Sequence, residues 1–166
     1  MRSRLIRIIV INVLFIISFA YCQTDEFNEY LQDLVKKFNV KQVKIDSLNL
    51  KDVILLDTRE FEEYKVSHIR SAIHVGYRDF SLERVDTLQK DINLVVYCSV
   101  GYRSSEIAEQ LQNAGFKNVK NLYGGIFTWA NSGRELVDDS SSTREIHVFD
   151  QYWGRFINNN DLIKVK

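Results

Sequence analysis

The chain has 166 residues, of which 45% are hydrophobic, so it is long enough for one packed core and too short for two full domains. Its 22 basic and 22 acidic residues give a formal net charge of zero, which argues against nonspecific binding to a phosphate backbone. We therefore expect one domain with short extensions and no nucleic-acid partner.

The first 22 residues have the pattern of a secretory signal peptide. Three arginines precede an apolar run over residues 8–17, which is about half of the roughly 20 residues that a membrane-spanning helix requires. Ser18 and Ala20 offer the small residues of a cleavage site, so we expect cleavage after Ala20 or, as a second choice, after Cys22. The sequence thus predicts an exported, periplasmic protein with no stable membrane span once it is processed.

Two other interpretations of this N-terminus stay open. One is an uncleaved membrane anchor, and the other is a lipoprotein acylated on Cys22, although Tyr21 stands where such sites have a small residue. A disulfide between Cys22 and Cys98 is not expected, because Cys22 lies in or beside the removed segment. Cys98 is therefore predicted to be a free thiol in an oxidising compartment, where it is a liability unless it is used.

The rest of the chain alternates between helical and strand patterns. Thr24 is placed to cap an amphipathic helix that runs to Phe38. Short apolar runs then alternate with helix-like segments, which predicts an α/β fold with a parallel sheet and helices on both of its faces. The runs lie at residues 43–45, 53–56, 72–75, 94–97 and 119–122.

The second half of the chain contains one further strong helix and a polar break. The helix is expected from Ser104 to Ala114, with Gly115 as its C′ residue. Residues 138–143 have the composition of a polar linker. The aromatic segment 147–156 is expected to pack back onto the domain as a docked tail without chemistry.

The stretch CSVGYRS puts Cys98 between the fourth apolar run and this helix. Ligands bind outside the carboxyl ends of parallel strands, where helix N-termini also point. A concave nest of backbone N–H groups there stabilises a thiolate, while Arg103 adds a permanent cation and Gly101 permits the turn. We therefore predict an anion-cradled cysteine nucleophile rather than an inert buried thiol. The residues expected to bind the substrate are Ser99, Val100, Gly101, Tyr102, Arg103 and Ser104.

Three separated motifs together resemble the single-domain rhodanese family of sulfurtransferases. They are LLDTREFEEYKVSHIRSAIHV at residues 55–75, CSVGYRS at residues 98–104 and NLYGGIFTW at residues 121–129. The resemblance implies a parallel five-stranded sheet flanked by helices, and a Cys98 persulfide formed from an anionic donor such as thiosulfate or polysulfide. It implies a thiosulfate:cyanide type of reaction with a thiol or cyanide as acceptor and with no cofactor.

The resemblance also sets the expected domain boundaries. We place a signal peptide at residues 1–22, an N-terminal helix at 23–42, a rhodanese domain at 43–134, and a linker with an aromatic extension at 135–166.

Four residues that match the family's first motif are assigned to structural support: Asp57, Arg59, Glu63 and His68. The first three are expected to form a buried, paired charge network, because isolated buried charges are costly. His68 is expected to be structural rather than a general base, because a thiolate held by a nest needs no base. Ser67 and Ser71 stand where the family commonly has glycine.

Other functions that use a similar cysteine loop are weighed against this one. Cysteine phosphatases usually have five residues between cysteine and arginine, whereas Cys98 and Arg103 have four between them. A noncatalytic partner-binding module and a sulfur carrier that passes its persulfide to another protein stay open as alternatives. His74 and His147 have no spacing typical of metal ligands, so no metal site is expected.

Overall fold

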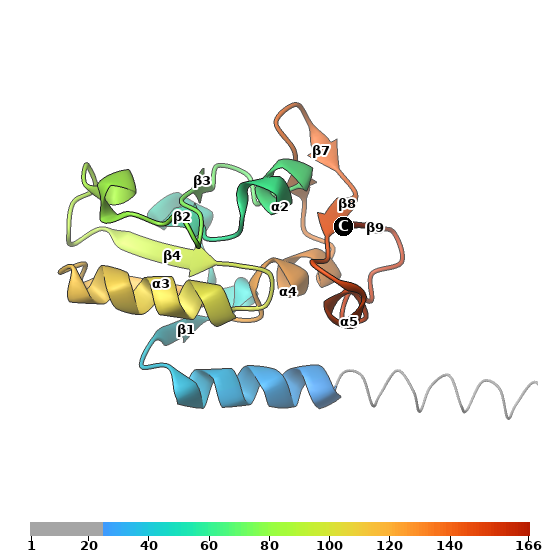
Figure 1. The fold of residues 1–166 in the computed structure, drawn as a ribbon, viewed down its shortest axis with the longest axis horizontal. Coiled ribbons are helices and arrows are strands. Elements are labelled where there is room, and N and C mark those ends of the chain that lie inside the picture. The colour runs from blue at the N-terminus through green and yellow to red at the C-terminus, as the bar shows by residue number, and fades with distance from the viewer. Residues whose placement is uncertain (1–24) are drawn as a thin grey trace, which may run out of the picture.

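The computed structural model describes residues 25–166, and Figure 1 shows their fold. The predicted signal peptide, both cleavage sites and the Thr24 cap lie outside these described residues. Within residues 25–166, no helix combines the length and the apolar character that a membrane span requires.

The five predicted strands form a single parallel sheet, as the alternation of the sequence indicated. Its spatial order is β1-β5-β4-β2-β3, with every neighbouring pair parallel. The central strand β4 is apolar almost throughout because helices cover both of its faces. The strands are β1 (Lys41–Val43), β2 (Ile54–Asp57), β3 (Ile73–His74), β4 (Asn93–Tyr97) and β5 (Asn118–Leu122).

The first strand lies earlier in the chain than the pattern predicted. The expected run of residues 43–45 crosses from β1 into the 3-10 turn η1 (Ile45–Ser47). Val43 and Ile45 are both buried in the same core, so their alternation resembles a strand although the backbone turns between them. Two more 3-10 turns, η2 (Leu50–Asp52) and η3 (Leu82–Val85), connect later elements.

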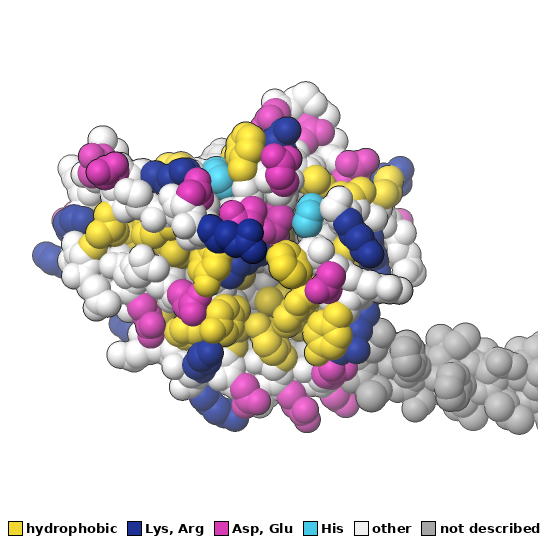
Figure 2. Space-filling model, in the orientation of Figure 1, with side chains coloured by type: hydrophobic (Ala, Val, Ile, Leu, Met, Phe, Trp, Pro, Cys, Tyr) yellow, Lys and Arg dark blue, Asp and Glu magenta, His cyan; other side chains and the backbone are white. Residues whose placement is uncertain are grey.

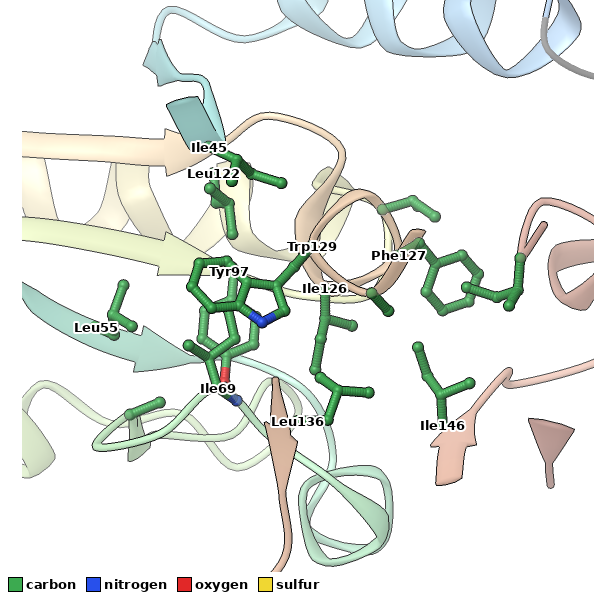
Figure 3. Packing of buried hydrophobic residues seen from close by; sticks show 14 of the residues in the cluster. Ile45, Leu55, Ile69, Tyr97, Leu122, Ile126, Phe127, Trp129, Leu136 and Ile146 are labelled. Atoms are coloured by element: carbon green, nitrogen blue, oxygen red, sulfur yellow. Dashed lines mark hydrogen bonds between the residues drawn. The ribbon is translucent and has the colours of Figure 1, made fainter. Parts of the chain in front are cut away.

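Helices pack on both faces of the sheet, and a separate hydrophobic cluster lies on each face. One face is covered by α3 (Tyr102–Asn113) and by the N-terminal helix of residues 25–37. The other face is covered by α4 (Gly125–Asn131), whose Trp129 packs beside Tyr97 in Figure 3. A short helix, α2 (Phe61–Val66), follows β2.

The helix after the cysteine loop begins at Tyr102 rather than at the predicted Ser104. Gly101 adopts a left-handed φ of 109° as its N-cap, and the Ser105 N–H already donates to the Gly101 carbonyl. The helix is therefore in place directly after the loop. At its other end Gly115 has a φ of 91°, which fits the predicted C′ position.

The C-terminal extension is more ordered than the predicted linker and tail. Residues 138–141 form the turn of a hairpin between β6 (Leu136–Val137) and β7 (Ser142–Thr143). Next, β8 (Glu145–His147) pairs in parallel with β9 (Ile163–Val165), and the chain between these two strands contains α5 (Gln151–Gly154). The extension packs back as expected, since Ile146 and Phe156 join the core of the α4 face. Figure 1 shows α5 near the carboxyl end of β4.

Candidate active site

Cys98 lies at the carboxyl end of β4, at the base of a loop that leads straight into α3. Its side chain is 1% exposed, and its Sγ accepts a hydrogen bond from the Gly101 N–H at 3.1 Å. Cys98 is a free thiol and the sole cysteine within residues 25–166. The thiol also lines a cavity of about 240 Å³, so it is covered by protein yet open to a small ligand.

The loop is held from behind by the start of α4. The Ile126 N–H donates to the Cys98 carbonyl at 2.9 Å, and the Phe127 N–H donates to the Ser99 carbonyl at 3.1 Å. In a trans peptide the N–H points opposite to the C=O, so the N–H groups that follow these carbonyls point away from α4. Among the N–H groups of the loop, that of Gly101 is directed at the Cys98 Sγ, while the nest of donors stays a prediction.

Gly125 makes this close approach possible. A Cβ built at Gly125 would lie 2.3 Å from the Cys98 carbonyl oxygen and 2.7 Å from that of Ser99. The residue also has a φ of 57°, in the left-handed region that favours glycine. The second glycine of the Gly-Gly pair in the third sequence motif is therefore explained by the contact between α4 and the cysteine loop.

The Ser104 side chain was expected to bind the substrate, but it supports the cysteine loop through a hydrogen bond instead. Its Oγ donates to Asn121 Oδ1 at 2.7 Å, and the Asn121 amide donates to the Gly101 carbonyl at 3.0 Å. Both side chains are fully buried. The remaining members of the predicted set either line the cavity or, in the case of Gly101, donate to Cys98.

Arg103 is paired within the protein rather than left free for an anion. Its guanidinium donates to both carboxylate oxygens of Glu63, at 2.6 and 2.8 Å, and to Ser99 Oγ at 3.0 Å. Burial alone would lower the pKa of Arg103, but the hydrogen bond to Glu63 and the negative charges of Cys98 and Glu63 raise it above its usual range. Burial likewise opposes ionisation of Glu63, yet Arg103, Arg59 and the Glu60 N–H lower its pKa to about 2.

The predicted charge network consists of two neighbouring pairs. Asp57 and Arg59 form a fully buried bidentate pair, with distances of 3.0 Å from Nε and 2.7 Å from Nη2. Arg59 Nη2 also donates to the Ser67 carbonyl at 2.6 Å, which fixes the end of α2. Glu63 instead pairs with Arg103, so this carboxylate connects α2 to the cysteine loop.

His68 and the two serines near it lie in a turn outside the cavity lining. The His68 ring stacks on Tyr64 at a centroid distance of 3.9 Å, and its Nδ1 lies 3.1 Å from the Tyr64 carbonyl. Its backbone exchanges two hydrogen bonds with Val137. Ser71 adopts a φ of 64°, the conformation of the glycine it replaces, whereas Ser67 is extended and needs no glycine.

Comparisons with known proteins agree with this geometry. The model of the rhodanese-like domain family matches residues 39–132. The chain belongs to the rhodanese-like domain family.

The rhodanese fold is also seen in solved structures, which support the fold alone at these low identities. A Bacillus halodurans protein has a TM-score of 0.55 and 23% identity over 71% of this chain and 88% of its own. A thiosulfate sulfurtransferase from Pseudomonas aeruginosa has a TM-score of 0.57 and 20% identity, covering 77% of this chain and 25% of its own.

Curated relatives include a tRNA uridine(34) hydroxylase from Yersinia pestis. It is 32% identical over 114 residues, which cover 66% of this chain and 32% of the relative. The chain therefore spans about a third of the length of this relative.

Three residues that line the cavity were missed by the sequence analysis, and all lie outside the matched rhodanese region: Tyr30, Phe149 and Trp153. Tyr30 comes from the N-terminal helix, and the other two come from the extension that was expected to be without chemistry. Their aromatic character was visible in the sequence, but their position opposite Cys98 depends on contacts between the two ends of the chain. Burial, followed by the charges of Cys98, Tyr102 and Tyr152, raises the pKa of Tyr30 above its usual range.

No cluster of three or more metal-ligating side chains occurs in the described part of the chain, residues 25–166.

Proposed function

We propose that this protein is a sulfurtransferase that carries sulfane sulfur on Cys98. The observation that carries the proposal is the Cys98 Sγ at the base of a cavity, with the Gly101 N–H directed at it from 3.1 Å. Backbone donors at this position stabilise a thiolate and, one atom further out, the negative charge of a persulfide.

The reaction has two displacement steps. The Cys98 thiolate attacks the outer sulfur of thiosulfate, a new Sγ–S bond forms as the donor S–S bond breaks, and sulfite leaves with the electron pair. An acceptor such as cyanide then attacks the outer sulfur of the persulfide, and thiocyanate leaves as the Cys98 thiolate is restored. No proton transfer is needed, which agrees with a His68 ring that packs on Tyr64 outside the cavity.

Arg103 acts in this scheme as a positioning residue. Glu63 accepts two hydrogen bonds from the Arg103 guanidinium, and Ser99 Oγ accepts a third. Arg103 therefore holds the cysteine loop in position against α2. A planar bidentate fork is suited to this role.

Two observations favour sulfur transfer over the other candidate functions. A partner-binding module needs neither a thiol in a cavity nor a loop braced by Arg103, and the chain has both. The hydroxylase relatives extend over about three times the shared region, and a net charge of zero offers little attraction for tRNA. We therefore assign to this chain the sulfur chemistry of the shared domain and no tRNA substrate.

The test is to incubate the purified protein without residues 1–22, and therefore without Cys22, and its Cys98→Ser variant with thiosulfate and, separately, with polysulfide. The wild type should gain the mass of one sulfur atom and, with thiosulfate and cyanide together, release thiocyanate. The variant should do neither. Equal thiocyanate from both proteins would refute the assignment.

We also propose that the protein is exported to a periplasm, on the strength of the N-terminal pattern of arginines, apolar run and small residues. If cleavage follows Cys22, Cys98 is the sole thiol and its persulfide must be discharged to an external acceptor. N-terminal sequencing after cell fractionation tests this. A chain that begins at Tyr21 or Gln23 is expected, an intact Met1 in the cytoplasmic fraction would refute export, and an acylated Cys22 would indicate a lipoprotein.

A further inference from the structure

We propose that Tyr30, Phe149 and Trp153 form a binding site for an apolar organic group, so that the preferred sulfur donor is an aryl or bulky alkyl compound rather than inorganic thiosulfate. We call these three side chains the aromatic wall. This inference rests on the proposed sulfur transfer and names its class of substrate. It assigns chemistry to two segments, residues 25–37 and 135–166, that lie beyond the matched rhodanese region.

The first line of evidence is the composition of the cavity. The aromatic wall and Tyr102 supply four aromatic rings around the Cys98 thiol, with Val100 beside them. Figure 2 shows apolar side chains gathered on this face of the molecule, where α3, α5 and the N-terminal helix meet. Such a lining favours a ligand with an apolar body and a small polar end.

The second line of evidence is electrostatic. Among the residues lining the cavity, all of which lie in the described part of the chain, Arg103 is the sole cation, and both oxygens of Glu63 neutralise it. A thiosulfate dianion would have to give up water without gaining an unpaired cation. A donor with one negative charge on its sulfane end and an apolar remainder loses less water and gains contact with the rings.

The third line of evidence is that the aromatic wall is fixed in place. Trp153 packs edge-on against Tyr30 with a centroid distance of 5.1 Å, and the Asp150 carboxylate accepts a hydrogen bond from the backbone N–H of Trp153 at 3.0 Å, which caps α5. The extension is joined to the N-terminal helix by the stacked rings of Phe27 and Phe156, 4.9 Å apart. A site with fixed rings loses little conformational entropy when a ligand binds.

Phe149 gives the most specific indication. It is 52% exposed and has a φ of 64°, which is unfavourable for a bulky residue, so neither burial nor backbone preference explains its position. Its N–H donates to His147 Nδ1 at 3.0 Å, and burial lowers the pKa of His147, which favours the neutral ring as acceptor. The Phe149 ring lies 5.8 Å from the Arg103 guanidinium and lines the cavity beside the cysteine loop.

The step for such a donor is balanced in the same way as the thiosulfate reaction. With an organic thiosulfonate, R–SO2–S⁻, the Cys98 thiolate attacks the terminal sulfur and the Sγ–S bond forms. The bond between the two donor sulfur atoms breaks, and the sulfinate R–SO2⁻ leaves with the electron pair. The organic group R takes no part in the bonds that change, but it alters the leaving ability of the sulfinate, so variants of the aromatic wall are needed to isolate its contribution to binding.

Two matched donors therefore test the aromatic wall: benzenethiosulfonate and methanethiosulfonate, which share a reacting end and differ in R. The full-length wild type should have a kcat/KM for the benzene compound about tenfold or more above that for the methyl compound, because burial of a ring is worth at least that much. Thiosulfate should be the poorest of the three donors. Equal values for the two thiosulfonates would overturn the proposal.

The variants Trp153→Ala and Phe149→Ala should remove most of the tenfold preference, because each should lower kcat/KM for benzenethiosulfonate far more than for methanethiosulfonate. Phe149→Ala guards against a folding defect, since its ring is half exposed and leaves no void in the core. Phe61→Ala is the matched control, because Phe61 is 54% exposed, close to the 52% of Phe149, but does not line the cavity. A preference that survives both substitutions, or that falls equally in Phe61→Ala, would overturn the proposal.

Binding to the Cys98→Ser protein, measured by calorimetry, separates this inference from the proposed function. If no donor transfers sulfur to the wild type, sulfur transfer fails. Tighter binding of benzenethiosulfonate than of methanethiosulfonate, lost in a Cys98→Ser/Trp153→Ala double variant, would still support the aromatic wall. No difference in affinity between the two compounds would overturn it.

Discussion

The two sides of the active-site cavity come from different parts of the chain and are built in different ways. The floor, formed by residues 98–104 and the charged side chains behind them, lies within the matched family region and is fixed by hydrogen bonds. The aromatic wall comes from the chain ends and is held by ring contacts and a few surface polar bonds. The position of the reacting thiol and the selectivity for the donor therefore depend on different sets of contacts.

This separation has a physical basis. Hydrogen-bonded charge pairs hold atoms to within tenths of an ångström, which suits a nucleophile. Packed aromatic rings act through contact area rather than through directed bonds, which suits recognition of an organic group. Changes in the floor should therefore affect all donors, whereas changes in the aromatic wall should affect only some of them.

The largest effect expected from a change in the floor is on the folding stability of the protein in acid, where Glu63 becomes protonated. The pKa of Glu63 is lowered from 4.5 to about 2, so its contribution is fully present above pH 4.5 and is lost as the pH falls toward 2. For a shift of this size in a buried carboxylate the contribution is roughly 3 kcal/mol. Urea denaturation should therefore show Glu63→Gln less stable than wild type at pH 7, with the difference shrinking below pH 4.5.

Glu62→Gln is the control for this experiment, because Glu62 is the exposed neighbour and forms only a long surface contact with Lys65. It should change stability little at any pH. A difference between wild type and Glu63→Gln that stays constant from pH 7 to pH 3 would contradict the pairing described here.

A second effect on the floor follows from the contact between Gly125 and the loop. Gly125→Ala places a methyl group where the Cys98 and Ser99 carbonyls lie, so the loop must shift. We expect kcat/KM to fall about a hundredfold for every donor, the usual consequence of moving a reacting group by an ångström. Steady-state rates with thiosulfate and both thiosulfonates measure this.

Gly133→Ala is the matched control, since Gly133 has a φ of 72° but open space where a Cβ would lie. Both substitutions carry the same left-handed strain, so the comparison isolates the steric contact. Equal activity of the two variants would show that the contact between α4 and the loop is unimportant for catalysis.

A third, smaller effect is expected from Arg103→Lys. The lysine keeps a positive charge but cannot reproduce the two bonds to Glu63 together with the bond to Ser99. We expect about a tenfold loss of kcat/KM for all donors alike, because a charge-assisted bond is weakened in the floor. Arg70→Lys, on a surface pair with Glu135, should leave the rates unchanged. Unchanged turnover of Arg103→Lys would mean that the backbone donors suffice.

The smallest effect concerns the anchor of the aromatic wall. Glu26 accepts hydrogen bonds from Arg155 and Tyr152, and both partners are partly exposed, so Glu26→Gln should cost less than about 1 kcal/mol of stability. The preference between the two thiosulfonates should persist, because the ring contacts remain. A large loss of the preference in this variant would show that polar bonds, rather than rings, hold the aromatic wall.

The sequence by itself determined the features that depend on local pattern. The alternation of apolar runs with helical segments specified the parallel sheet and its two covered faces, and the motif around Cys98 specified a thiol between strand and helix. These features could be predicted because strand and helix periodicity, and the conformational freedom of a residue such as Gly101, are set by near neighbours.

Tertiary structure alone decided which distant groups meet. Glu63 and Arg103 are 40 residues apart, and the pairing of Arg103 with Glu63 rather than with a substrate depends on where α2 lies against the cysteine loop. The rings of Phe27 and Phe156, near opposite ends of the chain, stack on each other, and Tyr30 packs on Trp153, so that Phe149 and Trp153 line the same cavity as Cys98. Side-chain type was visible in the sequence at each of these positions, but packing of the whole chain around one core determined their partners.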